Sequence, residues 1–153
     1  MEYVDAISTF NDLMQEIIRG FHVLEKNASI SCGITPSQWA TLLAFNNTNA
    51  LKMSELSERL SLATSTMTRM IDTLVKEGFI ERKPDFADRR LVMVRLTKEG
   101  KRLKQRLYKL QSGYFNTLFG HIDADIREQV VASLNNLLLA FRKIKVDNDV
   151  YHR

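Results

Sequence analysis

The sequence has little cysteine and no long apolar run, and each shortage excludes a class of protein. Among 153 residues there is one cysteine, Cys32, so the chain can form neither an internal disulfide nor a cysteine-based zinc cluster. No apolar stretch approaches the roughly 20 residues that span a bilayer, and the N-terminus lacks the basic region and cleavage site of a secretory signal. We therefore expect a protein of the reducing cytoplasm, without a membrane partner.

Signatures of enzyme chemistry are also missing from the sequence. His22, His121 and His152 are scattered and form no cluster that could hold a transition metal. There is no nucleophile paired with a base and no glycine-rich phosphate loop. Cys32 is placed after the first predicted helix with only Lys26 nearby as a cation, which favours a structural thiol over a reactive one. We expect no enzyme activity, no cofactor and no metal site.

The sequence does contain a concentrated block of positive charge. Residues 82–109 hold 11 Lys/Arg against three acids (Asp85, Asp88 and Glu99), whereas the rest of the chain holds 11 basic and 15 acidic residues. A basic block on a mildly acidic body is typical of a polyanion-binding face. Taken alone, the run 98–109 favours a mainly solvated helix face with some phosphate contact.

Apolar residues recur at helical spacing at both ends of the chain. At the N-terminus they predict a helix of about 25 residues with one apolar seam (Tyr3, Ile7, Phe10, Met14, Ile17, Phe21 and Leu24). Near the C-terminus one helix includes Leu103, and Asp123 is expected to cap another that continues to Ile144. We expect the seams to meet in a dimerisation bundle, the alternative being that they pack within one chain.

The central part of the sequence predicts shorter elements. The segment TPSQ at 35–38 has the form of a capping box with proline at the first helical position. A short helix from about Ser54, a turn at 61–63 and a longer helix over 64–77, ended by Gly78, match the helix-turn-helix pattern.

After Gly78 the period of the apolar residues changes from helical to two. Residues 79–83 and 91–96 are therefore predicted strands, and the long connection between them makes a protruding hairpin, the wing. Thr97 is expected to cap the helix that follows.

One segment carries a specific pattern of residues. MSELSERLSLATSTMTRMIDTLVKEGFIERKPDFADRRLVMVRLTKEG contains a helix ending in EGFIER, then DxxDRR, then a strand closing in LTKEG. This segment, with TPSQWATLLAF before it, resembles the MarR (multiple-antibiotic-resistance regulator) family of winged helix-turn-helix transcription factors. The resemblance extends over essentially the whole chain. It implies an obligate homodimer that represses at a pseudo-palindromic operator and responds to a small anionic or phenolic effector.

These features predict a mainly α protein with a winged helix-turn-helix lobe, a two-stranded wing, and long N- and C-terminal helices in a dimerisation bundle. The expected division is an N-terminal dimerisation helix and loop in 1–34, a DNA-binding lobe in 35–99 with its wing at about 79–96, and C-terminal dimerisation helices in 100–153.

The predicted recognition helix has a buried stripe and a polar face. Met67, Met70, Ile71 and Leu74 have the spacing of the stripe. Short hydroxyls can bond phosphates or base edges, and arginine can contact guanine through two bonds. The candidate DNA-binding residues of this helix are Thr64, Ser65, Thr66, Thr68 and Arg69. For Thr64, capping of the helix is the alternative role.

The wing supplies a second set of candidate DNA-binding residues. Arg89 is expected to enter the minor groove, where an A·T-rich sequence strengthens the negative potential. Asp88 is expected to pair with an arginine and set the loop shape, and Arg90 is its partner, a phosphate contact or both. Arg82 and Lys83 are expected to contact phosphates. The alternative is an exposed acid-base loop that contributes almost nothing.

The sequence pattern for an effector pocket is less specific than the pattern for DNA binding. It is built from Phe10, Met14, Phe21, Trp39 and Phe45, residues that at helical spacing are more often core. The leading functional hypothesis is a homodimeric, sequence-specific DNA-binding transcriptional regulator, a repressor released by an effector. The alternative is a winged-helix interaction module that binds a protein partner, its basic surface being incidental; a protein-binding face would show exposed apolar anchors.

Overall fold

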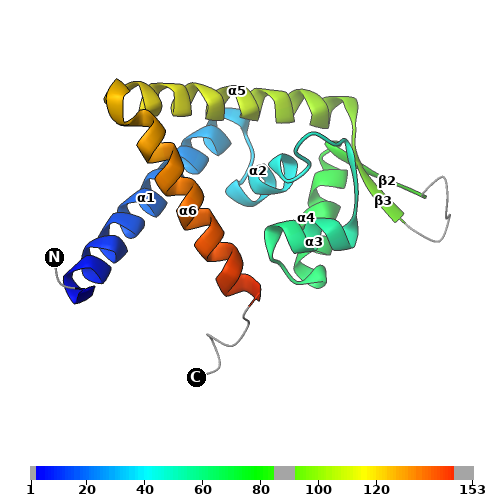
Figure 1. The fold of residues 1–153 in the computed structure, drawn as a ribbon. Coiled ribbons are helices and arrows are strands. Elements are labelled where there is room, and N and C mark those ends of the chain that lie inside the picture. Colours follow the sequence, from blue (N-terminus) through cyan, green and yellow to red (C-terminus); the bar gives the residue numbers. More distant parts are fainter. Residues whose placement is uncertain (1–2, 85–91, 147–153) are drawn as a thin grey trace. The chain divides into compact units, whose positions relative to one another are not determined.

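The computed structural model describes residues 3–84 and 92–146. Within them the chain is mainly helical with one small antiparallel sheet, as predicted (Figure 1). The chain divides into two compact units, residues 1–112 and 113–153, and each is described by itself. The elements in order are α1 (Tyr3–Cys32), α2 (Pro36–Leu43), β1 (Ala50–Lys52), α3 (Met53–Leu60), α4 (Thr64–Lys76), β2 (Ile80–Pro84), β3 (Val92–Leu96), α5 (Lys98–Gly120), the 3-10 turn η1 (Ala124–Ile126) and α6 (Arg127–Val146).

The first unit has a hydrophobic core to which α2, α3, α4 and the sheet all contribute. Met67, Ile71 and Leu74 come from one face of α4 and are buried, which confirms most of the predicted stripe; Met70 is half-buried. Burying one such side chain stabilises a fold by about 1.5–3 kcal/mol. The same core contains Trp39, Leu42, Phe45, Leu56, Ile80, Val94, Leu96 and Leu107.

Local signals in the sequence set the ends of the central helices. Gln38 N donates to Thr35 Oγ1 at 3.2 Å and Thr35 N donates to Gln38 Oε1 at 2.8 Å, so the predicted capping box at the start of α2 is confirmed. At the other end of the helix-turn-helix, α4 stops at Lys76, and Gly78 follows with φ of +79°. This left-handed conformation is one that glycine adopts without strain.

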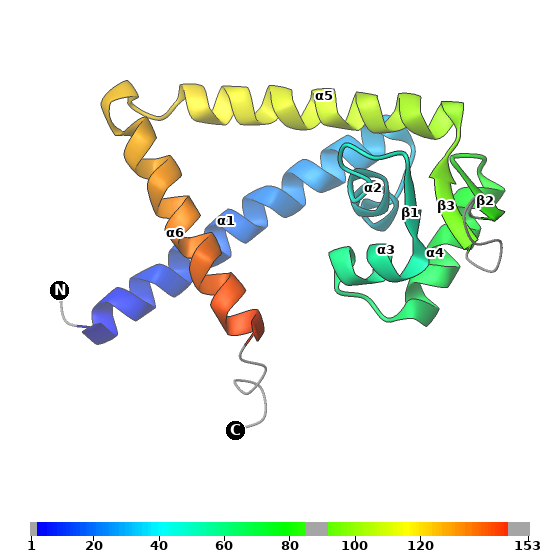
Figure 2. The same ribbon diagram turned by 45° about the vertical axis from the view of Figure 1, so that its right-hand side comes forward.

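The sheet contains one strand more than the sequence predicted. β2 and β3 form the antiparallel hairpin, in register from Ile80 opposite Leu96 to Pro84 opposite Val92. On its other side β3 pairs with β1, Leu51 lying opposite Val94 (Figure 2). The three residues of β1 are too few to display a period of two, so the sequence pattern missed them.

Two helix boundaries differ from the prediction. α1 has 30 residues and includes Cys32 in its last turn, so the placement of this thiol after the helix was wrong. The serines before it do not break the helix, because Ser31 Oγ donates to Asn27 O within the same turn; the helix ends before Gly33, whose φ is +69°. Asp123 precedes the turn η1 without a side-chain capping bond, and α6 begins only at Arg127.

The junction between β3 and α5 is closely packed. Thr97 Oγ1 accepts from Gly100 N at 3.0 Å, which confirms the predicted cap, and lies 2.7 Å from the carbonyl oxygen of Gly78. A Cβ placed on Gly100 would lie 2.0 Å from the backbone oxygen of Phe79. The threonine and glycine of LTKEG therefore attach the start of α5 to the end of the helix-turn-helix.

Candidate nucleic-acid interface

The polar face of α4 is exposed opposite its buried stripe. Thr64, Ser65, Thr66, Thr68 and Arg69 all lie in the first two turns with exposed side chains. The residue at the N-cap is Ala63, which offers no side-chain acceptor, so Thr64 does not cap the helix. The leading backbone N–H groups thus have no side-chain cap, and such groups favour an anion.

Hydrogen bonds to neighbouring elements orient α4. Glu77, at its C-terminal end, accepts from Gln38 Nε2 of α2 at 2.7 Å. The preceding helix α3 is held in turn, because Arg59 Nη1 donates to Ala44 O at 2.7 Å. Within α4, Thr68 Oγ1 donates to Thr64 O at 2.8 Å, which leaves the hydroxyl oxygen free to accept a further bond.

The base of the wing is ion-paired to α4. Arg82 Nη1 lies 2.6 Å from Asp72 Oδ1, and Lys83 Nζ lies 2.9 Å from Glu81 Oε1; all four side chains are between a third and about half exposed. Asp72 was not predicted as a site residue from the sequence. The feature that could have indicated it is an acidic residue on a helix face whose other residues suit an anion. The other wing candidates, Asp88, Arg89 and Arg90, lie outside the described residues.

Two cations of α5 bind backbone carbonyls of other elements, Lys104 in the lobe and Arg106 in α1. Lys104 Nζ donates to Asn46 O at 2.6 Å and to Thr48 O at 3.2 Å, and Arg106 Nη2 donates to Ser31 O at 2.8 Å. Burial, and to a smaller extent the charge of Lys101, lowers the pKa of Lys104 below its ordinary value. These two cations position α5 and do not serve as free charges for a polyanion.

The structure separates the five residues proposed for an effector pocket into core and surface. Trp39 and Phe45 are buried in the core of the lobe. Phe10 and Phe21 are exposed on α1, and Met14 is half-exposed there.

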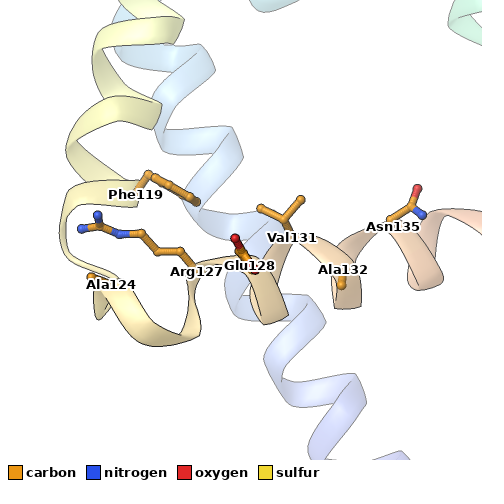
Figure 3. Close-up of a pocket in the computed structure, with 7 residues that line it drawn as sticks. All are labelled: Phe119, Ala124, Arg127, Glu128, Val131, Ala132 and Asn135. Carbon is orange, nitrogen blue, oxygen red and sulfur yellow. The ribbon is translucent and has the colours of Figure 1, made fainter.

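A groove of about 710 Å³ lies instead in the second unit (Figure 3). Its Arg127 extends over the ring of Phe119, with 5.4 Å from guanidinium carbon to ring centroid, and Arg127 Nε donates to Ile122 O at 3.0 Å. This guanidinium therefore closes the turn between α5 and α6. The groove is lined by Phe119, Ala124, Arg127, Glu128, Val131, Ala132 and Asn135.

Other kinds of site receive no support from the described parts of the chain. No helix in residues 3–84 and 92–146 combines the length and hydropathy that crossing a bilayer requires. In the same residues, no group of three or more His, Cys, Asp or Glu side chains could hold a metal ion.

A helix-turn-helix with a polar second helix, followed by an antiparallel wing with cations at its base, defines a winged helix-turn-helix DNA-binding protein. Residues 34–92 match the model of the MarR family. The HTH-type transcriptional regulator PrsX of Escherichia coli is 32% identical over 133 residues, which cover 84% of this chain and 80% of that protein. The chain therefore belongs to the MarR family and is a DNA-binding transcriptional regulator.

Solved structures share the fold. A MarR transcriptional regulator from Methanosarcina mazei Go1 superposes with a TM-score of 0.75 at 26% identity, covering 90% of this chain and 99% of that one. A mutant MarR of Escherichia coli complexed with operator DNA gives a TM-score of 0.70 at 26% identity, covering 92% of this chain and 99% of that one.

Proposed function

We propose that the protein is a homodimeric repressor that binds a pseudo-palindromic operator and is released by a small anionic or phenolic effector. The main support for sequence-specific DNA binding is the exposed polar face of α4, which lies adjacent to the cationic base of the wing. In each protomer α4 enters a major groove, where Arg69 reads a guanine and Thr64, Ser65, Thr66 and Thr68 contact base edges or phosphates.

The wing completes the proposed contact with DNA. Arg89 enters the neighbouring minor groove, while Asp88 and Arg90 set the loop and reach the backbone. Lys83 contacts a phosphate directly. Arg82 contributes to the same surface, its guanidinium held at the start of the wing by Asp72.

Exposed apolar surface supports the homodimer. None of the described residues 113–144 is buried in the single chain, although α6 carries many large apolar side chains. α1 is similar: Tyr3 is 82% exposed and Ile7 is 52% exposed. An exposed apolar surface of this extent is typical of one that contacts another protein chain. The residues concerned include Tyr3, Ile7, Phe10 and Ile17 of α1 and Val131, Leu134, Leu138, Phe141 and Ile144 of α6.

The proposed division of labour assigns dimerisation to 1–34 and 100–153 and DNA binding to 35–99. α5 connects the two functions, because Lys104 bonds its first half to the lobe and Arg106 bonds the same half to Ser31 of α1. Effector release rests on the family resemblance, with Phe10, Met14 and Phe21 of α1 as the accessible members of the original pocket prediction.

The test is fluorescence anisotropy of the protein on a duplex from its own upstream region and on a scrambled duplex, at low and near-physiological salt. The proposal predicts a salt-resistant preference for the native duplex, bound by one dimer that spans two half-sites about 34 Å apart. Equal, salt-labile binding to both duplexes would indicate counterion release alone. No binding to either would favour the winged-helix interaction module.

A further inference from the structure

The outward face of α5 carries a row of cations that the proposed operator contact does not use. Lys98, Arg102 and Lys109 are separated by four and seven residues, so they share one face of the helix. Gly100 and Leu107, which are buried, lie on the opposite face. Lys101 flanks the row and is exposed as well. We call Lys98, Lys101, Arg102 and Lys109 the α5 stripe.

The charges of the α5 stripe are available to a ligand. Glu99 is the single acid in the fully described segment 98–112, and it lies 3.1 Å from Arg102. Both side chains are largely exposed, at 66% and 59%, and an exposed pair of this kind contributes at most about 1 kcal/mol. A phosphate can therefore replace the carboxylate at little cost in free energy. Lys104 and Arg106 are left out, because they are bonded to carbonyls.

The stripe and the recognition helix face different directions within the first unit. In Figures 1 and 2, α2 lies between the first half of α5 and the pair α3 and α4. Buried Gly100 and Leu107 place the stripe on the side of α5 away from the lobe core, and the buried residues of α4 leave its polar face exposed on the side away from the same core. The stripe and the polar face of α4 are therefore separate surfaces, each able to bind a polyanion of its own.

The residues of the α5 stripe indicate which kind of polyanion it can bind. Its span from Lys98 to Lys109 is about 17 Å, from eleven helical steps of about 1.5 Å each, and duplex DNA offers one negative charge per about 1.7 Å of its axis. The stripe has no aromatic platform for unpaired bases, since the ring of Tyr108 lies 6.0 Å from Lys104 Nζ, towards the lobe. It also lacks the large apolar side chains that insert into a membrane surface. A regular duplex backbone fits best.

We propose that the α5 stripe binds the phosphate backbone of a second DNA duplex, so that the operator-bound protein can bridge two DNA segments. The contact is independent of base sequence and uses residues separate from α4 and the wing. It goes beyond operator recognition, because it assigns a second nucleic-acid surface to the same protomer.

The test immobilises the upstream duplex with bound protein and measures capture of a labelled scrambled duplex. Wild-type protein should capture it, and Lys98→Gln/Arg102→Gln/Lys109→Gln should reduce capture at least tenfold while affinity for the first duplex changes less than about twofold. The log–log salt dependence of capture should become shallower by about 3, the number of phosphate contacts removed. Lys26→Gln/Arg142→Gln/Lys143→Gln removes the same charge from other exposed positions of the proposed dimerisation segments. Sedimentation equilibrium establishes first that both variants have the oligomeric state of the wild type, and the control variant should then capture normally.

Three results would each overturn the proposal. The stripe variant could capture the scrambled duplex as well as the wild type does, both variants could lose capture equally, or the wild type could capture none. Failure of operator recognition is seen separately, as an absence of preference for the upstream duplex in anisotropy. In that event the two variants are compared on the scrambled duplex alone at low salt. The stripe variant must then weaken binding at least tenfold more than the control variant, and equal affinities reject the stripe.

Discussion

At the scale of single residues, the pattern LTKEG at the end of β3 has a steric explanation. Thr97 bonds the N-terminus of α5 and approaches the carbonyls of Gly78 and Phe79, while Gly100 leaves no room for a side chain beside Phe79. Because the obstructing atom is backbone, it cannot rotate away as a flexible side chain would. The pattern therefore preserves the attachment of α5 to the DNA-binding lobe.

Gly100→Ala should lower the free energy of unfolding by at least about 2 kcal/mol, because the added Cβ collides with the oxygen of Phe79. Gly113→Ala is the matched control, since a Cβ there meets nothing within 4 Å. In the interior of a helix it should stabilise the protein by about 0.5–1 kcal/mol. Urea denaturation of both variants checks this, and equal effects would contradict the steric account.

Lys104 makes the free energy of unfolding depend on pH, and the sign of this dependence follows from the environment of its ammonium group. Burial first, and Lys101 second, lower its pKa in the folded protein, whereas the unfolded chain has the ordinary lysine value of about 10.4. Between the two values the unfolded state binds more protons, so stability due to this group rises with pH in the window just below about 10.4. At lower pH the folded state retains the cost of desolvating the ammonium.

The stability of the wild type relative to Lys104→Met should therefore increase as pH is raised from about 8 to about 10.4. Chemical denaturation of both proteins at several pH values measures the difference, in which the other lysines cancel. A difference that is flat or that decreases with pH would show that the ammonium is not desolvated in the fold.

At the scale of elements, local signals in the sequence predicted most helices and strands of the lobe. Contacts between elements that are distant in the sequence were not predicted. The capping box of α2 and the stripe of α4 depend on residues three or four apart, so they are visible in the sequence. β1 exists because β3 offers it an edge, and the ion pair between Asp72 and Arg82 joins two elements. Such tertiary partners leave no periodic trace in one sequence.

The Asp72–Arg82 pair should affect DNA discrimination more than stability. Because it is about half exposed, Asp72→Asn should change the free energy of unfolding by less than about 1 kcal/mol. It removes a negative charge near the DNA and releases Arg82, so affinity for a scrambled duplex should rise severalfold, and the preference for the native duplex should fall. Anisotropy on both duplexes measures the ratio; an unchanged ratio would mean that the pair does not position the wing.

At the scale of the whole molecule, the single chain leaves the second unit without a core of its own in the described residues 113–144. The apolar surfaces of α1 and α6 are consistent with the predicted dimerisation bundle, which periodicity suggested from the sequence alone. The sequence could not supply the identity of the operator or the effector, because both depend on molecules that the chain contacts.

Ile7→Glu should raise the dimer dissociation constant at least tenfold, about 1.4 kcal/mol, by burying a charge in the proposed interface. Gln15→Glu introduces the same charge at an exposed polar position of α1 and should leave the dimer intact. Sedimentation equilibrium distinguishes the two. A monomeric wild type, or a dimer unaffected by Ile7→Glu, would contradict an interface that includes the N-terminal part of α1.

The most direct test of the central claim, that α4 reads sequence while the wing base holds phosphate, compares Arg69→Ala with Lys83→Ala. Affinities for the native and scrambled duplexes are measured by anisotropy over a range of salt. Arg69→Ala should lose about 1–3 kcal/mol on the native duplex and little on the scrambled one. Lys83→Ala should weaken both equally and reduce the salt slope by about 1. Equal weakening of both duplexes by Arg69→Ala would contradict the assignment of α4 as the reading element.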